Sequence, residues 1–277
     1  MSQNSPVFLT ALLLLLLLVP APVPAEALAD AEVVHRFGYR AVEVDDVGSF
    51  PTDIERAAES MLTVWQQWIG THRIRPVQVE LVLLGTPAAF EEMKQQLAPE
   101  LPLVNGFYAT ATHQAVVQYE SRQPALNRST AIHEVAHLIT SSQVGPVDRW
   151  LSEGISEYFE TLRTESDGIR ISPNLRYEDE LQPRNLVTFL ALTDKDWQSD
   201  GSPEHYATAW SLVYFLMDSR RGRVALREVL VRMTGPLRSS LSIPEFLDLS
   251  YPGGLAALER NWHQWLVAGE FVDHALY

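Results

Sequence analysis

The spacing of apolar residues divides the chain into a first part with strands and helices and a second part that is mostly helical. In the first part, runs that alternate apolar and polar residues are separated by stretches in which apolar residues recur every three or four positions. Alternation is typical of half-buried strands, and the longer period is typical of amphipathic helices. We expect strands over residues 33–44, 77–84 and 107–119, helices over residues 51–69 and 86–97, and mostly helices from residue 129 onward.

Local signals refine these elements. In the first strand Phe37 and Tyr39 alternate in one phase and Val42 in the other, which predicts a bulge or a bend near Ala41. Thr86 is expected to cap the second helix. A turn at residues 105–106 precedes the stretch 107–119, which is either one long strand or a hairpin.

The first 25 residues are set apart by a long apolar run that ends in three prolines. Val23 and Ala25 provide the small residues of a cleavage site, so residues 1–25 are predicted to be a signal peptide, although no Lys or Arg precedes the apolar run. An uncleaved anchor is the alternative. We expect residues 26–277 to form a single catalytic domain, with an α/β sublobe over 26–125 and a helical sublobe over 126–277.

Composition excludes several classes of function. The chain has no cysteine, which rules out disulfides, thiolate metal ligands and a cysteine nucleophile. Its 35 acidic and 21 basic residues give a net charge of −14, which argues against nucleic acid or an anionic membrane surface as a partner. From the predicted signal peptide and the absence of cysteine we therefore expect an exported protein that is located in a bacterial periplasm or outside a bacterial cell.

The candidate chemistry begins at His133-Glu134-Val135-Ala136-His137. Ser129 or Thr130 is expected to cap the helix that carries this motif. His133 and His137 lie one turn apart on one helix face, so both imidazoles can bind one ion. Glu134 flanks that ion and can act as a general base. The alternative is a pair of structural histidines with Glu134 in solvent.

A second motif follows a Gly-Pro turn at residues 145–146: Trp150-Leu-Ser-Glu153-Gly-Ile-Ser-Glu157-Tyr-Phe-Glu160. A catalytic zinc ion usually has three protein ligands and one open position. Glu153, 16 residues after His137, is far enough along the chain to offer a carboxylate from a neighbouring helix.

The two motifs together resemble the gluzincins, the zinc metallopeptidase superfamily of thermolysin and the alanyl-aminopeptidase-like enzymes. The sequence looks most like the exported bacterial proteins of the peptidase-MA-like group. The resemblance implies a zincin-like α+β fold, with an N-terminal mixed sheet, a mostly helical C-terminal part and the metal helix between them. It also implies one Zn²⁺ ion per chain held by His133, His137 and Glu153.

Further roles are assigned around this expected site. Glu157 lies one turn after Glu153 and is predicted to accept the second ring N–H of His133, with an exposed surface glutamate as the alternative. Glu160 is expected in solvent or in a salt bridge. Gluzincins commonly add a Tyr or His that stabilises the oxyanion; of His205, Tyr206 and Tyr214 we select Tyr206.

Substrate binding follows from the same resemblance, because peptidases of this architecture bind the substrate backbone along an edge strand. Residues 109–117 are expected to provide that edge. We therefore predict a zinc metallopeptidase that hydrolyses peptide bonds in peptides or proteins. The alternatives are an inactive zinc-binding or protein-binding homologue and a zinc hydrolase of non-peptide amides.

Overall fold

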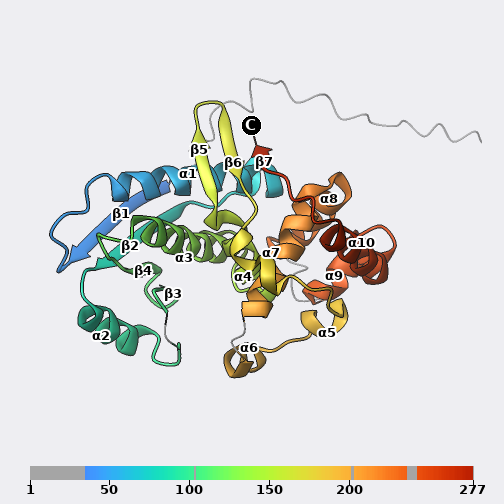
Figure 1. Ribbon diagram of the computed structural model, residues 1–277. Helices are drawn as coiled ribbons and strands as arrows, with labels where there is room; N and C mark the ends of the chain where they lie inside the picture. Colours follow the sequence, from blue (N-terminus) through green and yellow to red (C-terminus); the bar gives the residue numbers. More distant parts are fainter. Residues whose placement is uncertain (1–34, 103, 201–202, 236–241, 277) are drawn as a thin grey trace, which may run out of the picture. The chain divides into compact units, whose positions relative to one another are not determined.

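A four-stranded mixed sheet is built from the first half of the chain (Figure 1). The computed structural model describes residues 35–102, 104–200, 203–235 and 242–276, and all structural statements refer to these residues. The spatial order is β1-β2-β4-β3; β1, β2 and β4 are parallel and β3 is antiparallel to β4. The bounds are β1 (His35–Val42), β2 (Val77–Leu84), β3 (Gly106–Ala109) and β4 (Gln114–Gln118).

The strand β1 pairs with β2 continuously over all of its 8 residues. No bulge therefore occurs near Ala41; of the two expected features the structure has the bend, at Glu43 directly after β1, with a φ of 55°. The apolar residues change phase along β1 because this strand presents apolar side chains to both faces of the sheet. Phe37 packs against the larger hydrophobic core and Val42 against the smaller one.

Helices cover both faces of the sheet. They are α1 (Phe50–Ile69), α2 (Pro87–Leu97) and α3 (Pro124–Val144). Val79 of β2 shares the larger core with α1 and α3, whereas Val82 packs with Phe90 of α2 on the opposite face. The expected cap is confirmed, since the Thr86 hydroxyl accepts a hydrogen bond from the Ala89 N–H at the start of α2.

The helix α3 begins earlier than the sequence analysis predicts. Ser129 and Thr130 lie inside it, and neither caps its start. Pro124 occupies the first turn, where its missing N–H costs nothing. The Asn127 side chain holds the preceding loop through hydrogen bonds with the backbone N and O of Glu120 (3.1 and 2.8 Å).

The stretch 107–119 forms the hairpin of β3 and β4, one of the two expected alternatives. The predicted edge over residues 109–117 is wrong, because this segment contains the turn and most of β4. β4 is paired on both sides, with β2 and with β3. The strand at that edge of the sheet is β3.

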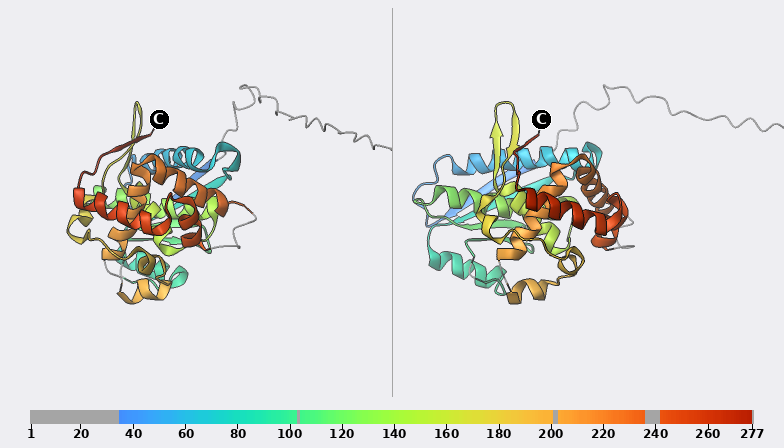
Figure 2. Two further views of the ribbon diagram at one scale, coloured as in Figure 1. Left: turned by 90° about the vertical axis from the view of Figure 1, so that its right-hand side faces the viewer. Right: turned by 45° about the vertical axis from the view of Figure 1, so that its right-hand side comes forward.

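The second half of the chain is mostly helical, as expected, but it also contains a small sheet that the sequence analysis does not predict. Figures 1 and 2 show the helices in yellow-green to red and the β5–β6 hairpin standing out from them. The strands β5, β6 and β7 are antiparallel neighbours. The elements are α4 (Arg149–Glu160), β5 (Leu162–Glu165), β6 (Gly168–Ile171), a 3-10 helix η3 (Leu175–Glu180), α5 (Leu186–Leu190), α6 (Asp194–Asp200), α7 (Pro203–Asp218), α8 (Arg220–Met233), α9 (Ile243–Ser250), α10 (Gly254–Ala268) and β7 (His274–Leu276), and the short 3-10 helix η2 (Thr71–Arg73) follows α1.

The described residues form one compact unit. The expected boundary between the sublobes, at residues 125–126, falls in the first turn of α3, so this helix joins the two parts. The predicted signal peptide over residues 1–25 lies outside the described residues. Within the described part of the chain, no helix combines the length and the apolar character that a membrane span needs.

The helix α4 is held in a close contact with α7. A Cβ atom at Gly154 would lie 2.6 Å from the backbone oxygen of Ala209. The aromatic side of α7, with Trp210 and Tyr214 fully buried, packs into the same core. The contact fixes the distance between the helix that carries Glu153 and the helix that begins near Tyr206.

This contact predicts that Gly154→Ala destabilises the protein by about 1–3 kcal/mol, because α4 and α7 must separate. Helix propensity alone would favour alanine by about 1 kcal/mol. Urea unfolding followed by circular dichroism measures the difference. Gly235→Ala is the control, because its added Cβ would meet only ordinary contacts at 3.6 Å. A Gly154→Ala protein as stable as the wild type would contradict the prediction.

Candidate metal centre

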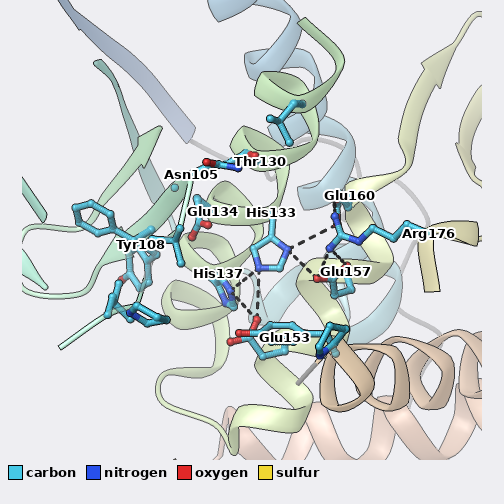
Figure 3. Close-up of a pocket in the computed structure, with 18 of the residues that line it drawn as sticks. Asn105, Tyr108, Thr130, His133, Glu134, His137, Glu153, Glu157, Glu160 and Arg176 are labelled. Carbon is cyan, nitrogen blue, oxygen red and sulfur yellow. Dashed lines mark hydrogen bonds and ion pairs between the residues drawn. The ribbon is translucent and has the colours of Figure 1, made fainter. Parts of the chain in front are cut away.

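Three side chains from α3 and α4 direct one ligand atom each at a common point (Figure 3). The Nε2 atoms of His133 and His137 lie 3.1 Å apart. Each of them lies 3.4 Å from Oε2 of Glu153. The helical spacing of the two histidines and the packing of α4 against α3 produce this arrangement. The structure thus brings together the three residues that were predicted as ligands.

These distances fit a single small cation. Bonds of about 2.0–2.1 Å around a tetrahedral zinc ion place neighbouring ligand atoms about 3.3–3.4 Å apart. The three observed separations, 3.1, 3.4 and 3.4 Å, approach the edges of such a tetrahedron. The residues of this group could therefore hold a metal ion.

The second nitrogen of each imidazole faces a different partner. Nδ1 of His137 lies 2.9 Å from the hydroxyl of Ser152. Nδ1 of His133 lies 3.6 Å from Oε1 of Glu157 and 4.0 Å from Oε2 of Glu160. If these nitrogens carry the ring protons, both Nε2 lone pairs are free to point at the ion, as in most metal-binding histidines. Glu157 is buried beside His133, but 3.6 Å is too long for a hydrogen bond, so its acceptance of the His133 N–H stays a prediction.

Glu157 and Glu160 share one counter-charge. Arg176, from η3, pairs with Glu157 at 2.7 Å and with Glu160 at 2.5 Å. Tyr177 donates a hydrogen bond to Glu157 (2.8 Å), and Asn174 contacts both carboxylates. Glu160 is buried in this salt bridge and is not in solvent.

His133, Glu157 and Glu160 form a second possible ligand group. Its two carboxylates already have the guanidinium of Arg176 as a partner, as Figure 3 shows. The first group is therefore the better candidate for a metal ion.

Glu134 lines the cleft beside the imidazoles. In Figure 3 it lies on the other side of His133 from Glu157. Burial raises the pKa of its carboxyl group, while the neighbouring imidazoles act in the opposite direction. Gly106 of β3 allows the close approach, because a Cβ there would lie 2.5 Å from Thr130 and 3.1 Å from the Glu134 side chain.

Tyr206 also lines the cleft, at the start of α7. Burial, together with the charge of Glu153, raises the pKa of its hydroxyl to about 12, so it is a protonated hydrogen-bond donor at neutral pH. The other two candidates lie elsewhere. Tyr214 is buried and donates hydrogen bonds to backbone oxygens. His205 packs at a tilt against Trp197 and lines a separate small cavity.

The cleft has a volume of about 560 Å³. One wall is the edge strand β3 with the residues around it, and the opposite wall comes from α4, η3 and the start of α7. The cleft has four carboxyl groups and two guanidinium groups, whose formal charges sum to −2 only when every carboxyl group is ionised and the imidazoles are neutral. These groups are Glu134, Glu153, Glu157, Glu160, Arg149 and Arg176. Burial raises the pKa of Glu134 and of Glu157, so not every carboxyl group in the cleft carries a full charge near neutral pH.

The electrostatics of the cleft favour positive charge at the imidazoles. Burial alone would lower the pKa of His133, but Glu153, Glu157 and Glu134 outweigh it and raise the pKa to about 10. Burial likewise opposes ionisation of Glu153, yet the two imidazoles hold its pKa well below the usual range. A divalent cation bound by the imidazoles would supply the positive charge that these carboxylates favour, and the imidazoles would not need to be protonated.

Three residues of the site were not predicted from the sequence: Arg149, Ser152 and Arg176. Arg149 is four residues before Glu153, a spacing that places both on one helix face and could have indicated the pair. Ser152 could have been found by asking which group near Glu153 accepts the N–H of His137. No local pattern marks Arg176, because η3 is brought to the site by the fold.

Residues 127–233 match a protein family described as a protein of unknown function (DUF1570). The matched region extends from the first turn of α3 to the end of α8, so it contains all six predicted site residues. No curated protein sequence matches the chain. The description of the family gives no activity.

The geometry predicts one divalent metal ion per chain, and His137→Gln should remove most of it. Loss of one of three ligands should weaken binding by more than the roughly 10–100-fold typical of substitutions behind the ligands. Atomic absorption and chelator competition measure metal content and affinity. His72→Gln, an exposed histidine outside the cleft, is the control. Equal metal content in both variants would place the ion elsewhere.

Proposed function

We propose that this protein is a zinc-dependent hydrolase that cleaves peptide bonds. The observation that carries the proposal is the convergence of His133, His137 and Glu153 at separations that fit a tetrahedral ion. Two neutral imidazoles and one carboxylate form a typical catalytic zinc set, and they leave one coordination position without a protein ligand. The excess of carboxyl groups over guanidinium groups in the cleft supports a divalent ion as well.

Zinc, when bound at these residues, would act as a Lewis acid that polarises the substrate carbonyl and lowers the pKa of water from about 15.7 towards 7. Glu134 would take a proton from the attacking water molecule and pass it to the leaving amine nitrogen. Its buried position between the imidazoles and β3 supports this role. Tyr206, protonated at neutral pH, would donate a hydrogen bond to the developing oxyanion.

The edge strand β3 supports a peptide as the substrate. Only β4 pairs with it among the described strands, so its other edge offers backbone donors and acceptors beside the cleft. An extended peptide could add to this edge as a further strand, with its scissile bond next to Glu134. A non-peptide amide would gain less from this edge, which is why we prefer a peptide.

Glu134→Gln should abolish hydrolysis and spare the metal. We expect activity to fall by about 100–10,000-fold, because a general base typically contributes that much. Cleavage of a mixed peptide library, followed by mass spectrometry, and zinc analysis provide the two measurements. Glu228→Gln, an exposed residue on α8, is the matched control.

Three results would redirect the proposal. Full activity in Glu134→Gln would exclude its role as the base. Stoichiometric zinc without any Glu134-dependent hydrolysis would favour a zinc-binding homologue without catalytic activity. Hydrolysis of N-acylated non-peptide amides in preference to the library would change the substrate class and leave the mechanism intact.

We also expect the protein to be exported, which detection of the mature chain outside the cytoplasm would test.

A further inference from the structure

Arg149 connects two groups of the proposed site through three neighbouring contacts. It is the first residue of α4, one turn before Glu153. Its Nε lies 3.3 Å from Oε1 of Glu153, and its Nη2 donates a long hydrogen bond of 3.5 Å to the hydroxyl of Tyr206. Its guanidinium carbon lies 5.4 Å from the centre of the Trp197 ring on α6.

The two carboxylate oxygens of Glu153 have different neighbours. Oε2 faces both imidazoles, whereas Oε1 faces the guanidinium of Arg149. A carboxylate can bind a metal ion through one oxygen or through both. Pairing of Oε1 with Arg149 favours binding through Oε2 alone, which leaves a coordination position open for water or substrate.

The contact with Tyr206 fixes the direction of a proton. A guanidinium group has donors and no acceptor, so the Tyr206 oxygen must accept in this hydrogen bond. The hydroxyl hydrogen of Tyr206 is therefore left to be donated elsewhere, and the side chain lines the cleft. Arg149 thus prepares Tyr206 to be a donor towards a substrate oxygen.

Trp197 restrains the guanidinium itself. Its ring contacts Arg149 and also packs edge-on against Tyr206, with ring centres 5.4 Å apart. A planar guanidinium can lie over an aromatic ring while its charge pairs with a carboxylate and one of its N–H groups donates to a hydroxyl. The single ammonium group of lysine cannot replace this geometry.

We propose that Arg149 is a positioning residue that keeps Glu153 a one-oxygen ligand and orients the Tyr206 hydroxyl as a donor. This inference rests on the proposed function, because it assigns Arg149 a role toward the same metal ion and the same oxyanion. Arg149 contacts both the metal ligand Glu153 and the oxyanion donor Tyr206.

Metal binding tests the contact with Glu153 without any substrate. In Arg149→Gln, Glu153 is free to bind through both oxygens, and we expect zinc affinity to change by about 10–100-fold, as for other substitutions behind a ligand. In the cobalt-substituted protein the visible bands should weaken as the ion becomes five-coordinate. Arg227→Gln, an exposed arginine on α8, should leave both measurements unchanged.

A double-mutant cycle with a hydroxamate inhibitor tests the contact with Tyr206. In the wild-type background Tyr206→Phe should weaken inhibitor binding by about 3–10-fold, the value of one hydrogen bond. In the Arg149→Gln background it should have almost no effect. Arg149→Lys keeps a charge beside Glu153, so it should retain the wild-type cobalt spectrum within error and still lose the coupling to Tyr206.

The outcomes separate this inference from the proposed function. A wild-type protein that binds zinc and inhibitor but cleaves no peptide would refute the proposed activity and leave the role of Arg149 open to both tests. Unchanged zinc affinity and cobalt spectrum in Arg149→Gln, or a full effect of Tyr206→Phe in that background, would overturn the inference. If Arg149→Gln fails to fold, Arg149→Lys decides through the inhibitor cycle.

Discussion

Four carboxylates share one cleft, and the rest of the site is arranged so that their charge is tolerated there. Burial of an ionised carboxylate without a partner costs several kcal/mol. Arg176 from η3 pairs with Glu157 and Glu160. Arg149 faces Oε1 of Glu153, and the two imidazoles face Oε2 of the same carboxylate. The elements of the second half of the chain hold these partners in position. The carboxyl groups outnumber the guanidinium groups, which makes the site suited to a divalent ion.

Much of the site could be predicted because it depends on local helix geometry. Two histidines four residues apart must lie on one face, and Glu153 and Glu157 repeat that spacing on the next helix. The positions of helices and strands in the first half followed from apolar periodicity for the same reason. The change of phase near Ala41 could not distinguish a bulge from a bend, because apolar side chains on both faces of β1 produce the same pattern.

The remaining features depend on contacts between distant parts of the chain. β3, not β4, forms the edge beside the cleft, and this order follows from the pairing of β4 with β2. Arg176 reaches Glu157 only because η3 folds back over α4. The sheet of β5, β6 and β7 uses a strand from the end of the chain, and its four-residue and three-residue strands carry little periodic signal.

The shortness of β3 limits what the cleft can hold. A strand of 4 residues is about 13 Å long at about 3.3 Å per residue. Backbone pairing along it would grip only a few residues of a substrate, and those residues must already be extended with their N–H and C=O groups free. Segments inside helices or paired strands do not meet this condition. Accessible loops, chain ends and unfolded chains do meet it. The conformation of a target segment would therefore decide whether it can bind, before the identity of its side chains matters.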